Sequence, residues 1–380
     1  MTSPKTKFIL VITTVVLVAL PALWLWHSSS KTVSSTQPSF QQSIATNVPA
    51  VKLEPTAFDE ALTKAWKDQA AATDDAGKRQ ALALLKAAAA TGSTNDISTA
   101  IRRFLDSKQD APTGQGFKVG KNGFLTEAPT FRTFLLDYLA QIDPAAAAAY
   151  ARIILQSKDS PDEWALALRN LALGDTGPDA RKLLEAKTVE MLSYPPWQQN
   201  PSTGYLEAFD TAVYLGDSQL LPTLSHLLQL PDNSAVAHAA FLAMDRMVIN
   251  NPAAMLTTLE SDPALISGFT STRADYFARA DVRDPQQRQI LENYLLNQQT
   301  PAAEISAFAG IYPNANYMVS ANLLTPVQTP DASAIAARDA AALQTLQQWL
   351  ADPRFAGLKA SLTMAQVRLA GFVQQESQGH

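Results

Sequence analysis

The histidines are the first residues to consider for acid–base or metal chemistry, since imidazole titrates near neutral pH and binds metals. The chain has four of them: His27, His226, His238 and His380. His226 and His238 fall on separate expected helices and could share a metal with Asp210 or Asp245. A histidine on a mostly apolar helix is more often a packed residue that finds a hydrogen bond. We therefore predict no metal site and no cofactor.

Carboxylates on helices could supply the acid and the base of glycan hydrolysis, which needs two such groups close together. The candidates lie in one stretch of expected helices: Glu163, Glu185, Glu190, Glu207 and Asp210. On amphipathic helices such residues usually form a solvated face, so we predict no catalytic residue. The alternative, an envelope enzyme acting on cell-wall glycan or peptide, requires a convergent, buried pair of acids in a deep cleft.

Several other classes of chemistry are excluded by composition or spacing. The chain contains no cysteine, which removes thiol catalysis, thiolate metal sites and disulfides. Neither His-Glu-x-x-His nor Gly-x-Ser-x-Gly occurs. Asn122 follows Lys121 where a phosphate loop needs serine or threonine. A net charge of −5 gives no attraction to nucleic acid.

Aromatic residues in a proline-rich segment are the best candidates for a binding site. Residues 194–205 read YPPWQQNPSTGY, and paired prolines cannot continue a helix, so we expect a loop. Tryptophan and tyrosine are favoured at interface hot spots, which predicts that Tyr194, Trp197 and Tyr205 bind a protein partner. The alternative is that Trp197 folds back over the gap between two helix layers. A similar segment over residues 311–330 is expected before two long C-terminal helices.

The elements that position these residues begin with a hydrophobic segment. Residues 8–26 carry no charge over nineteen positions, enough for a helix to span a hydrocarbon core of about 30 Å. Lys5 and Lys7 precede the segment, which keeps the N-terminus inside, and Phe8, Trp24 and Trp26 mark the ends of the expected anchor. A cleaved signal peptide is the alternative. Both interpretations place the rest of the chain outside the cytoplasm.

The expected organisation has five parts. Residues 1–27 form the cytoplasmic N-terminus and anchor, and residues 28–55 form a flexible tether rich in Ser, Thr, Pro and Gln. Residues 56–158 form an N-terminal helical part, and a helical array follows over residues 159–312. Residues 313–380 supply a proline-rich loop and the C-terminal helices. The chain has no glycosylation sequon, because proline follows Asn200, and this favours a bacterial inner membrane facing the periplasm.

Helix start signals dominate the chain after residue 55. Each is a capping residue followed by proline at the first helical position: Asp143-Pro144, Ser160-Pro161, Asn251-Pro252, Asp262-Pro263, Asp284-Pro285, Thr300-Pro301 and Asp352-Pro353. The spacing of Ser160 and Glu163 predicts a capping box. Residues 114–127 depart from the helical pattern, and Asn122-Gly123 predicts a peripheral β-hairpin with a type I′ turn.

An internal repeat organises residues 160–260. Leu-Gly-Asp ends a first helix at Asp175 and again at Asp217, and a degenerate third copy begins near Ala235. In the second copy, residues 211–228 read TAVYLGDSQLLPTLSHLL. This pattern resembles bacterial HEAT-type repeats, in which an Ala-Leu-rich helix meets a Leu-Gly-Asp turn and a second helix runs Leu-Pro-x-Leu. The resemblance implies a solenoid-like stack whose concave face binds partners, and it implies no catalytic residues.

Together these observations predict an all-α chain. An N-terminal transmembrane helix precedes a solenoid-like, right-handed array of antiparallel helix pairs with one small inserted β-hairpin. The predicted function is a non-catalytic, membrane-anchored scaffold or adaptor that presents its helical surface to a protein partner.

Overall fold

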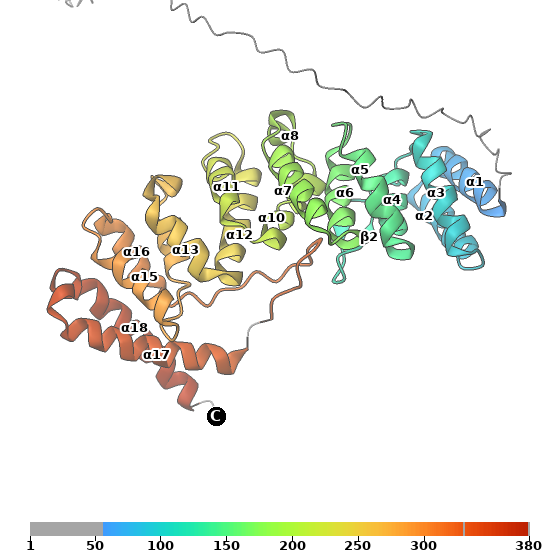
Figure 1. The fold of residues 1–380 in the computed structure, drawn as a ribbon. Coiled ribbons are helices and arrows are strands. Elements are labelled where there is room, and N and C mark those ends of the chain that lie inside the picture. The colour runs from blue at the N-terminus through green and yellow to red at the C-terminus, as the bar shows by residue number, and fades with distance from the viewer. Residues whose placement is uncertain (1–55, 330, 379–380) are drawn as a thin grey trace, which may run out of the picture. The chain divides into compact units, whose positions relative to one another are not determined.

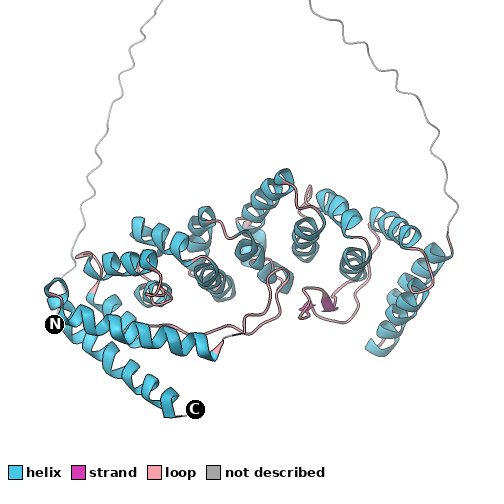
Figure 2. Cartoon of the chain, turned by 60° about the horizontal axis from the view of Figure 1, so that its bottom comes forward, coloured by secondary structure: helices cyan, strands magenta, loops and turns pink. Residues whose placement is uncertain are grey.

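The computed structural model describes residues 56–329 and 331–378, and almost all of its regular structure is helical (Figures 1 and 2). The N-terminal part contains α1 (Ala57–Ala71), α2 (Asp75–Ala89), α3 (Thr94–Asp106), β1 (Lys118–Val119), β2 (Leu125–Glu127), α4 (Phe131–Ile142) and α5 (Pro144–Ile154). The middle contains α6 (Pro161–Gly174), α7 (Pro178–Leu192), α8 (Pro195–Gln199), α9 (Thr203–Glu207), α10 (Asp210–Leu215), the 3₁₀ helix η1 (Ser218–Leu220), α11 (Leu221–Leu228), α12 (Ser234–Asn250) and α13 (Pro252–Ser261). The C-terminal part contains η2 (Pro263–Ile266), α14 (Thr270–Phe277), α15 (Pro285–Leu296), α16 (Ala302–Ile311), α17 (Ala332–Ala351), η3 (Pro353–Leu358) and α18 (Lys359–Gln378).

The prediction of a helical chain with one small β-hairpin is therefore confirmed. The expected anchor and tether, with Phe8, Trp24 and Trp26, lie outside the described residues. Within residues 56–378, no helix combines the length and the apolar character needed to cross a bilayer.

Most of the predicted pairs of cap and proline mark a helix start. Four α-helices begin at the prolines of these pairs: Pro144, Pro161, Pro252 and Pro285. The Asp262 and Asp352 pairs start short 3₁₀ turns instead, and α16 begins only after Pro301. The predicted capping box is half formed. Ser160 Oγ accepts from the Glu163 N–H, but the Glu163 carboxylate pairs with Arg132 at 2.7 and 2.9 Å because that buried cation is the stronger partner.

Glycine serves different purposes in the two Leu-Gly-Asp turns. Gly216 ends α10 with a φ of 61°, the left-handed conformation that favours glycine. Gly174 remains helical, and a Cβ there would lie 2.0 Å from the Pro144 carbonyl oxygen. Gly174 is thus required by the close approach of α5 and α6, and not by a left-handed conformation.

The glycine-rich stretch forms the predicted antiparallel hairpin, but with a different turn. Its closing bond runs from the Gly123 N–H to the Gly120 carbonyl at 3.0 Å, and Gly123, with φ 81°, follows the turn. Asn122 has a negative φ, whereas a type I′ turn needs positive φ at both central residues, so that prediction is wrong. The peripheral position is also wrong, because the buried Phe117 ties the hairpin to the core.

The proline-rich segment 194–205 is helical where a loop was predicted. Pro195 and Pro196 occupy the first turn of α8, where backbone N–H groups have no intrahelical partner to lose. Ser202 then caps α9 by accepting from the Tyr205 N–H. Paired prolines block the continuation of a helix but are compatible with its start.

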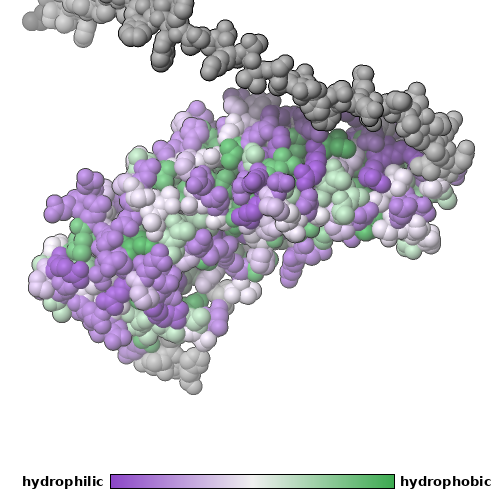
Figure 3. Space-filling view, in the orientation of Figure 1, coloured by the Kyte–Doolittle hydropathy of each residue, from purple (hydrophilic) through white to green (hydrophobic). Residues whose placement is uncertain are grey.

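Helices that follow one another in the chain pack together, as α5 does with α6, α11 with α12 and α17 with α18. Their buried apolar residues form one continuous cluster from Phe58 to Leu369. Hydrophilic residues predominate on the face shown in Figure 3, and hydrophobic residues occur there in small groups. Buried side chains also pair between helices that are not consecutive, as Arg169 on α6 does with Asp137 on α4 and Arg246 on α12 does with Asp210 on α10.

Candidate functional site

The candidate site is built around an extended segment, residues 312–329, which we call the strap. It connects α16 to α17 without forming a helix or a strand. Figure 1 shows it running from α16 past α12 towards α10 and the hairpin, then returning to α17. Extended backbone inside a protein needs partners for its N–H and C=O groups, and the helices supply them.

Arg279 holds the first part of the strap. It lies just after α14, and its Nε and Nη2 donate to the two carboxylate oxygens of Asp245 on α12 at 2.9 and 2.8 Å. Nη1 donates to the strap carbonyls of Asn314, at 3.2 Å, and Asn316. The Asn314 N–H in turn donates to the Ala278 carbonyl at 2.8 Å. This guanidinium therefore bridges a helix to the main chain of the strap.

Asp210 holds the turn of the strap. Its Oδ2 accepts from the main-chain N–H groups of Leu324 and Thr325 at 2.7 and 2.9 Å, and its Oδ1 accepts from Thr325 Oγ1. Arg246 on α12 donates to Asp210 Oδ1 at 2.8 Å, to Asn322 Oδ1 at 3.3 Å and to Thr325 Oγ1. Asp210, Arg246, Asn322 and Thr325 are all buried. Both oxygens of Asp210 are thus fully engaged in holding the strap.

The hairpin meets the strap at the same point. A Cβ on Gly123 would lie 2.6 Å from the Leu323 carbonyl oxygen, so only glycine permits this approach. The Gly123 carbonyl accepts from Nη1 of Arg169 at 3.0 Å, and this fully buried arginine also pairs with Asp137 on α4. The hairpin is therefore positioned by the helices to contact the strap.

Three buried arginine–aspartate pairs recur along these helices: Arg169 with Asp137, Arg246 with Asp210, and Arg279 with Asp245. Burial lowers the pKa of Arg169, and it raises the pKa of Asp245 although the paired Arg279 opposes that change. Buried pairs add little net stability, but removing one partner costs about 3–5 kcal/mol. Here the pairs hold side chains in positions from which Arg169 bonds to the backbone of the hairpin, and Asp210 and Arg279 bond to the backbone of the strap.

An open cavity of about 310 Å³, which we call the apolar cavity, lies beside the strap. Its walls come from α9, α10 and α12, and from the strap itself: Leu206, Phe209, Val213, Ala239, Leu242, Met318, Ser320 and Asn322. Glu207 also lines it. Burial, and then the neighbouring charge of Asp210, raise the pKa of Glu207 to about 7. The cavity thus joins apolar walls to one carboxyl group that changes charge near neutral pH.

The predicted aromatic residues do not line this site. Trp197 is only 7 % exposed, with its ring edge-on to Trp164 and Tyr194 at centroid distances of 5.4 and 4.9 Å. Tyr205 is fully buried, and its hydroxyl donates to the Leu192 carbonyl at 3.0 Å. This arrangement matches the alternative stated above, in which Trp197 covers helices.

The predicted carboxylates are distributed between ion pairs and the cavity. Glu163, Glu185 and Glu190 pair with Arg132, Arg181 and Lys158 respectively. Glu207 and Asp210 line the same cavity, but Asp210 is committed to the strap. Of the predicted carboxylates, this leaves Glu207 as the one placed to meet a ligand in that cavity.

The histidines considered for metal binding are both exposed. His238 stacks on Phe241 at a centroid distance of 6.3 Å and lies at the edge of the apolar cavity, whereas His226 does not line it. No group of three or more His, Asp or Glu side chains among the described residues could hold a metal ion.

Sequence reasoning missed the strap's partners. Residues 311–330 were identified only as a loop, and Arg246 and Arg279 were not singled out. The available signal was an arginine or aspartate on an otherwise apolar helix face, as in α12 with Asp245 and Arg246. A scan against protein-family models, a search of curated proteins and a search of solved structures find no match.

Proposed function

We propose that this chain is a non-catalytic scaffold or adaptor that binds an extended segment of a protein partner beside the strap. In this proposal, residues 8–26 anchor it in a membrane with the helices outside the cytoplasm. The helices form a HEAT-like, solenoid-like array of antiparallel pairs. Its surface is the binding element, as in other arrays that stack repeated helix pairs.

The observation that carries the proposal is the way in which the strap is held. Arg279 and Asp210 bond to its backbone carbonyl and N–H groups, which every polypeptide offers. A helical surface that holds one extended segment through the main chain is suited to hold another beside it. Neighbouring pockets would supply specificity for the side chains of such a segment.

The apolar cavity supports a specific kind of partner. Its volume of about 310 Å³ falls within the range typical of ligand sites, and Phe209, Val213 and Leu242 offer apolar walls. A partner lysine or arginine near Glu207 would favour the ionised carboxylate, which burial otherwise disfavours. The favoured partner segment therefore carries a large apolar residue and a basic residue close together.

A peptide-selection experiment tests this proposal. A displayed library of short random peptides is selected against the full-length chain, and enriched peptides are then titrated against Ala239→Trp. Ala239 is half-buried in the cavity wall, so tryptophan fills the space. We expect enriched peptides to carry an apolar and a basic residue, and Ala239→Trp to weaken them at least roughly tenfold, or about 1.4 kcal/mol.

The matched control is Ala70→Trp, which adds the same ring at an exposed position of α1. It should leave peptide affinity unchanged. Failure to enrich any peptide, or equal binding by Ala239→Trp and the unmodified chain, would overturn the proposal.

A further inference from the structure

A second cavity, of about 250 Å³, lies between the strap, α12 and α17, and we call it the arginine cavity. Three arginines line it from two places in the chain: Arg279 and Arg283 in the connection between α14 and α15, and Arg338 on α17. Tyr317 of the strap, Asp281 and Gln287 complete its polar wall. Its lining therefore carries three positive groups and one negative group.

Two of the three arginines are held by carboxylates. Arg279 is paired with Asp245, as described above, and Arg283 donates to both oxygens of Asp281 at 2.6–3.0 Å. Burial alone would raise the pKa of Asp281, but its bonds with Arg283 lower it overall, so the carboxylate is ionised. These two positive charges are matched within the protein.

Arg338 differs from the other two. Its Nε and Nη2 are buried, yet neither donates a hydrogen bond to any residue that the structure describes. Buried guanidinium donors without a partner are unusual, because such groups are normally satisfied by protein, water or a ligand. Arg338 lines the open cavity, so an acceptor bound there would lie beside these donors.

We infer that the arginine cavity binds a small phosphate group, either as the free ion or carried by a small organic molecule. A phosphate offers several charged acceptor oxygens, and arginine binds such oxygens through paired donors. Arg338 supplies the buried donors, with Arg283 and Tyr317 beside it on the cavity wall. The inference does not depend on the proposed peptide-binding function, since none of these three residues lines the apolar cavity.

Calorimetric titration of the full-length chain tests the inference. Inorganic phosphate and glycerol phosphate are titrated separately at constant ionic strength, because the first tests the free ion and the second a phosphate on an organic group. We expect saturable binding of at least one of them. Arg338→Gln should weaken it at least tenfold, and Arg338→Lys, which keeps the charge but loses the paired donors, should weaken it less.

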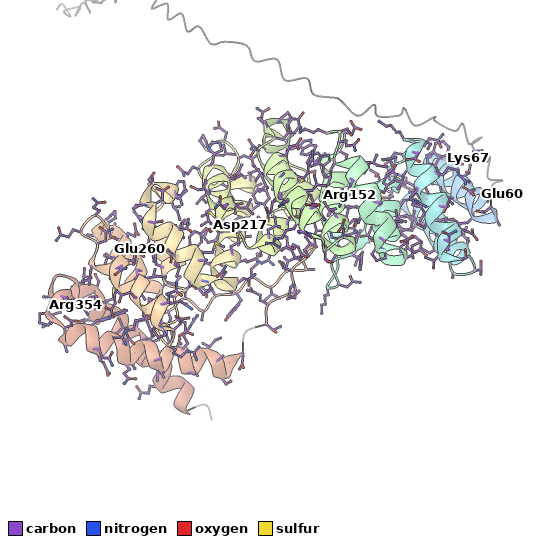
Figure 4. The ribbon with its side chains drawn as sticks, viewed as in Figure 1. Glu60, Lys67, Arg152, Asp217, Glu260 and Arg354 are labelled. Atoms are coloured by element: carbon purple, nitrogen blue, oxygen red, sulfur yellow. The ribbon has the colours of Figure 1, made fainter. Side chains whose placement is uncertain are left out.

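Controls separate a binding role from a structural one. Lys67→Gln removes one positive charge from an exposed position of α1 (Figure 4) and should leave phosphate affinity unchanged. Circular dichroism in chloride buffer shows whether Arg338→Gln folds, and Arg283→Gln serves as the second variant if it does not. Three results would overturn the inference. They are no saturable binding by the unmodified chain, binding by both Arg338→Gln and Arg283→Gln as tight as that of the unmodified chain, and binding of acetate as tight as that of phosphate.

Discussion

Residues 194–205 and the strap both contain prolines and tyrosines, yet they fold in opposite ways. The first segment forms α8 and α9 and buries Trp197 against Trp164. The second stays extended, and ion-paired side chains of the helices bind its backbone. Segments with related residue types therefore form core helices at residues 194–205 and an extended segment bound by the helices in the strap.

The difference follows from where each segment finds partners for its backbone. In residues 194–205, the prolines come at a helix start, so the following N–H groups bond within the helix. In the strap, the Asn322 side chain bonds to nearby backbone groups, because its Nδ2 donates to the Ser320 and Thr325 carbonyls. Asn side chains compete with helical bonding in this way. Asp210 binds the backbone N–H groups of Leu324 and Thr325, and Arg279 binds two further backbone carbonyls of the strap.

The largest expected effect concerns residues 194–205, the segment that is buried in the core. Trp197→Ala should reduce the free energy of unfolding by about 3–5 kcal/mol, because it removes a buried aromatic ring from between Trp164 and Tyr194. Chemical denaturation of the full-length chain measures the change. Trp66→Ala, at a half-buried position of α1, should cost less. A loss below about 1 kcal/mol for Trp197→Ala would contradict its role in the core.

A smaller effect is expected when hydrogen bonds of the strap are removed. Asn322→Ala removes buried hydrogen bonds to Arg246 and within the strap, which should cost about 1–3 kcal/mol. Val319→Ser, at a strap position that is 76 % exposed, should change the free energy of unfolding by less than about 0.5 kcal/mol. The same denaturation curves measure both. Equal losses would mean that the strap is held by contacts other than those of Asn322.

The last expected effect concerns pH. Because the pKa of Glu207 rises from 4.5 to about 7 on folding, the folded chain binds more protons between these values. Its stability should therefore fall as the pH rises through this window. Glu207→Gln removes this contribution. The melting temperature of the variant, relative to that of the unmodified chain, should therefore rise as the pH increases from 4.5 to 7. Glu60→Gln, on the exposed side of α1 (Figure 4), should show no such gain, and a constant difference for Glu207→Gln would refute the assignment.

Local features of the fold could be predicted from the sequence. The caps at Asp143 and Ser160 place their helices correctly, since a cap and the following proline act within one turn. The hairpin was located correctly for the same reason. Its turn type was not, because Asn122-Gly123 is compatible with more than one loop length.

Contacts between distant residues could not be predicted. Asp210 was considered as a possible metal ligand and as a catalytic acid, but its partners Leu324 and Thr325 lie 114 and 115 positions later in the chain. The burial of Trp197 likewise depends on Trp164 in another helix. Periodicity identifies which face of a helix is apolar, but it does not show which segment covers a polar one.

The separation between Asp210 and Thr325 also bears on the order of folding. Neighbouring helices can pair as soon as both exist, whereas the strap requires α10, α12 and the hairpin to be in place first. During synthesis, therefore, the helices around Asp210 are complete before the segment that will cover them has been made.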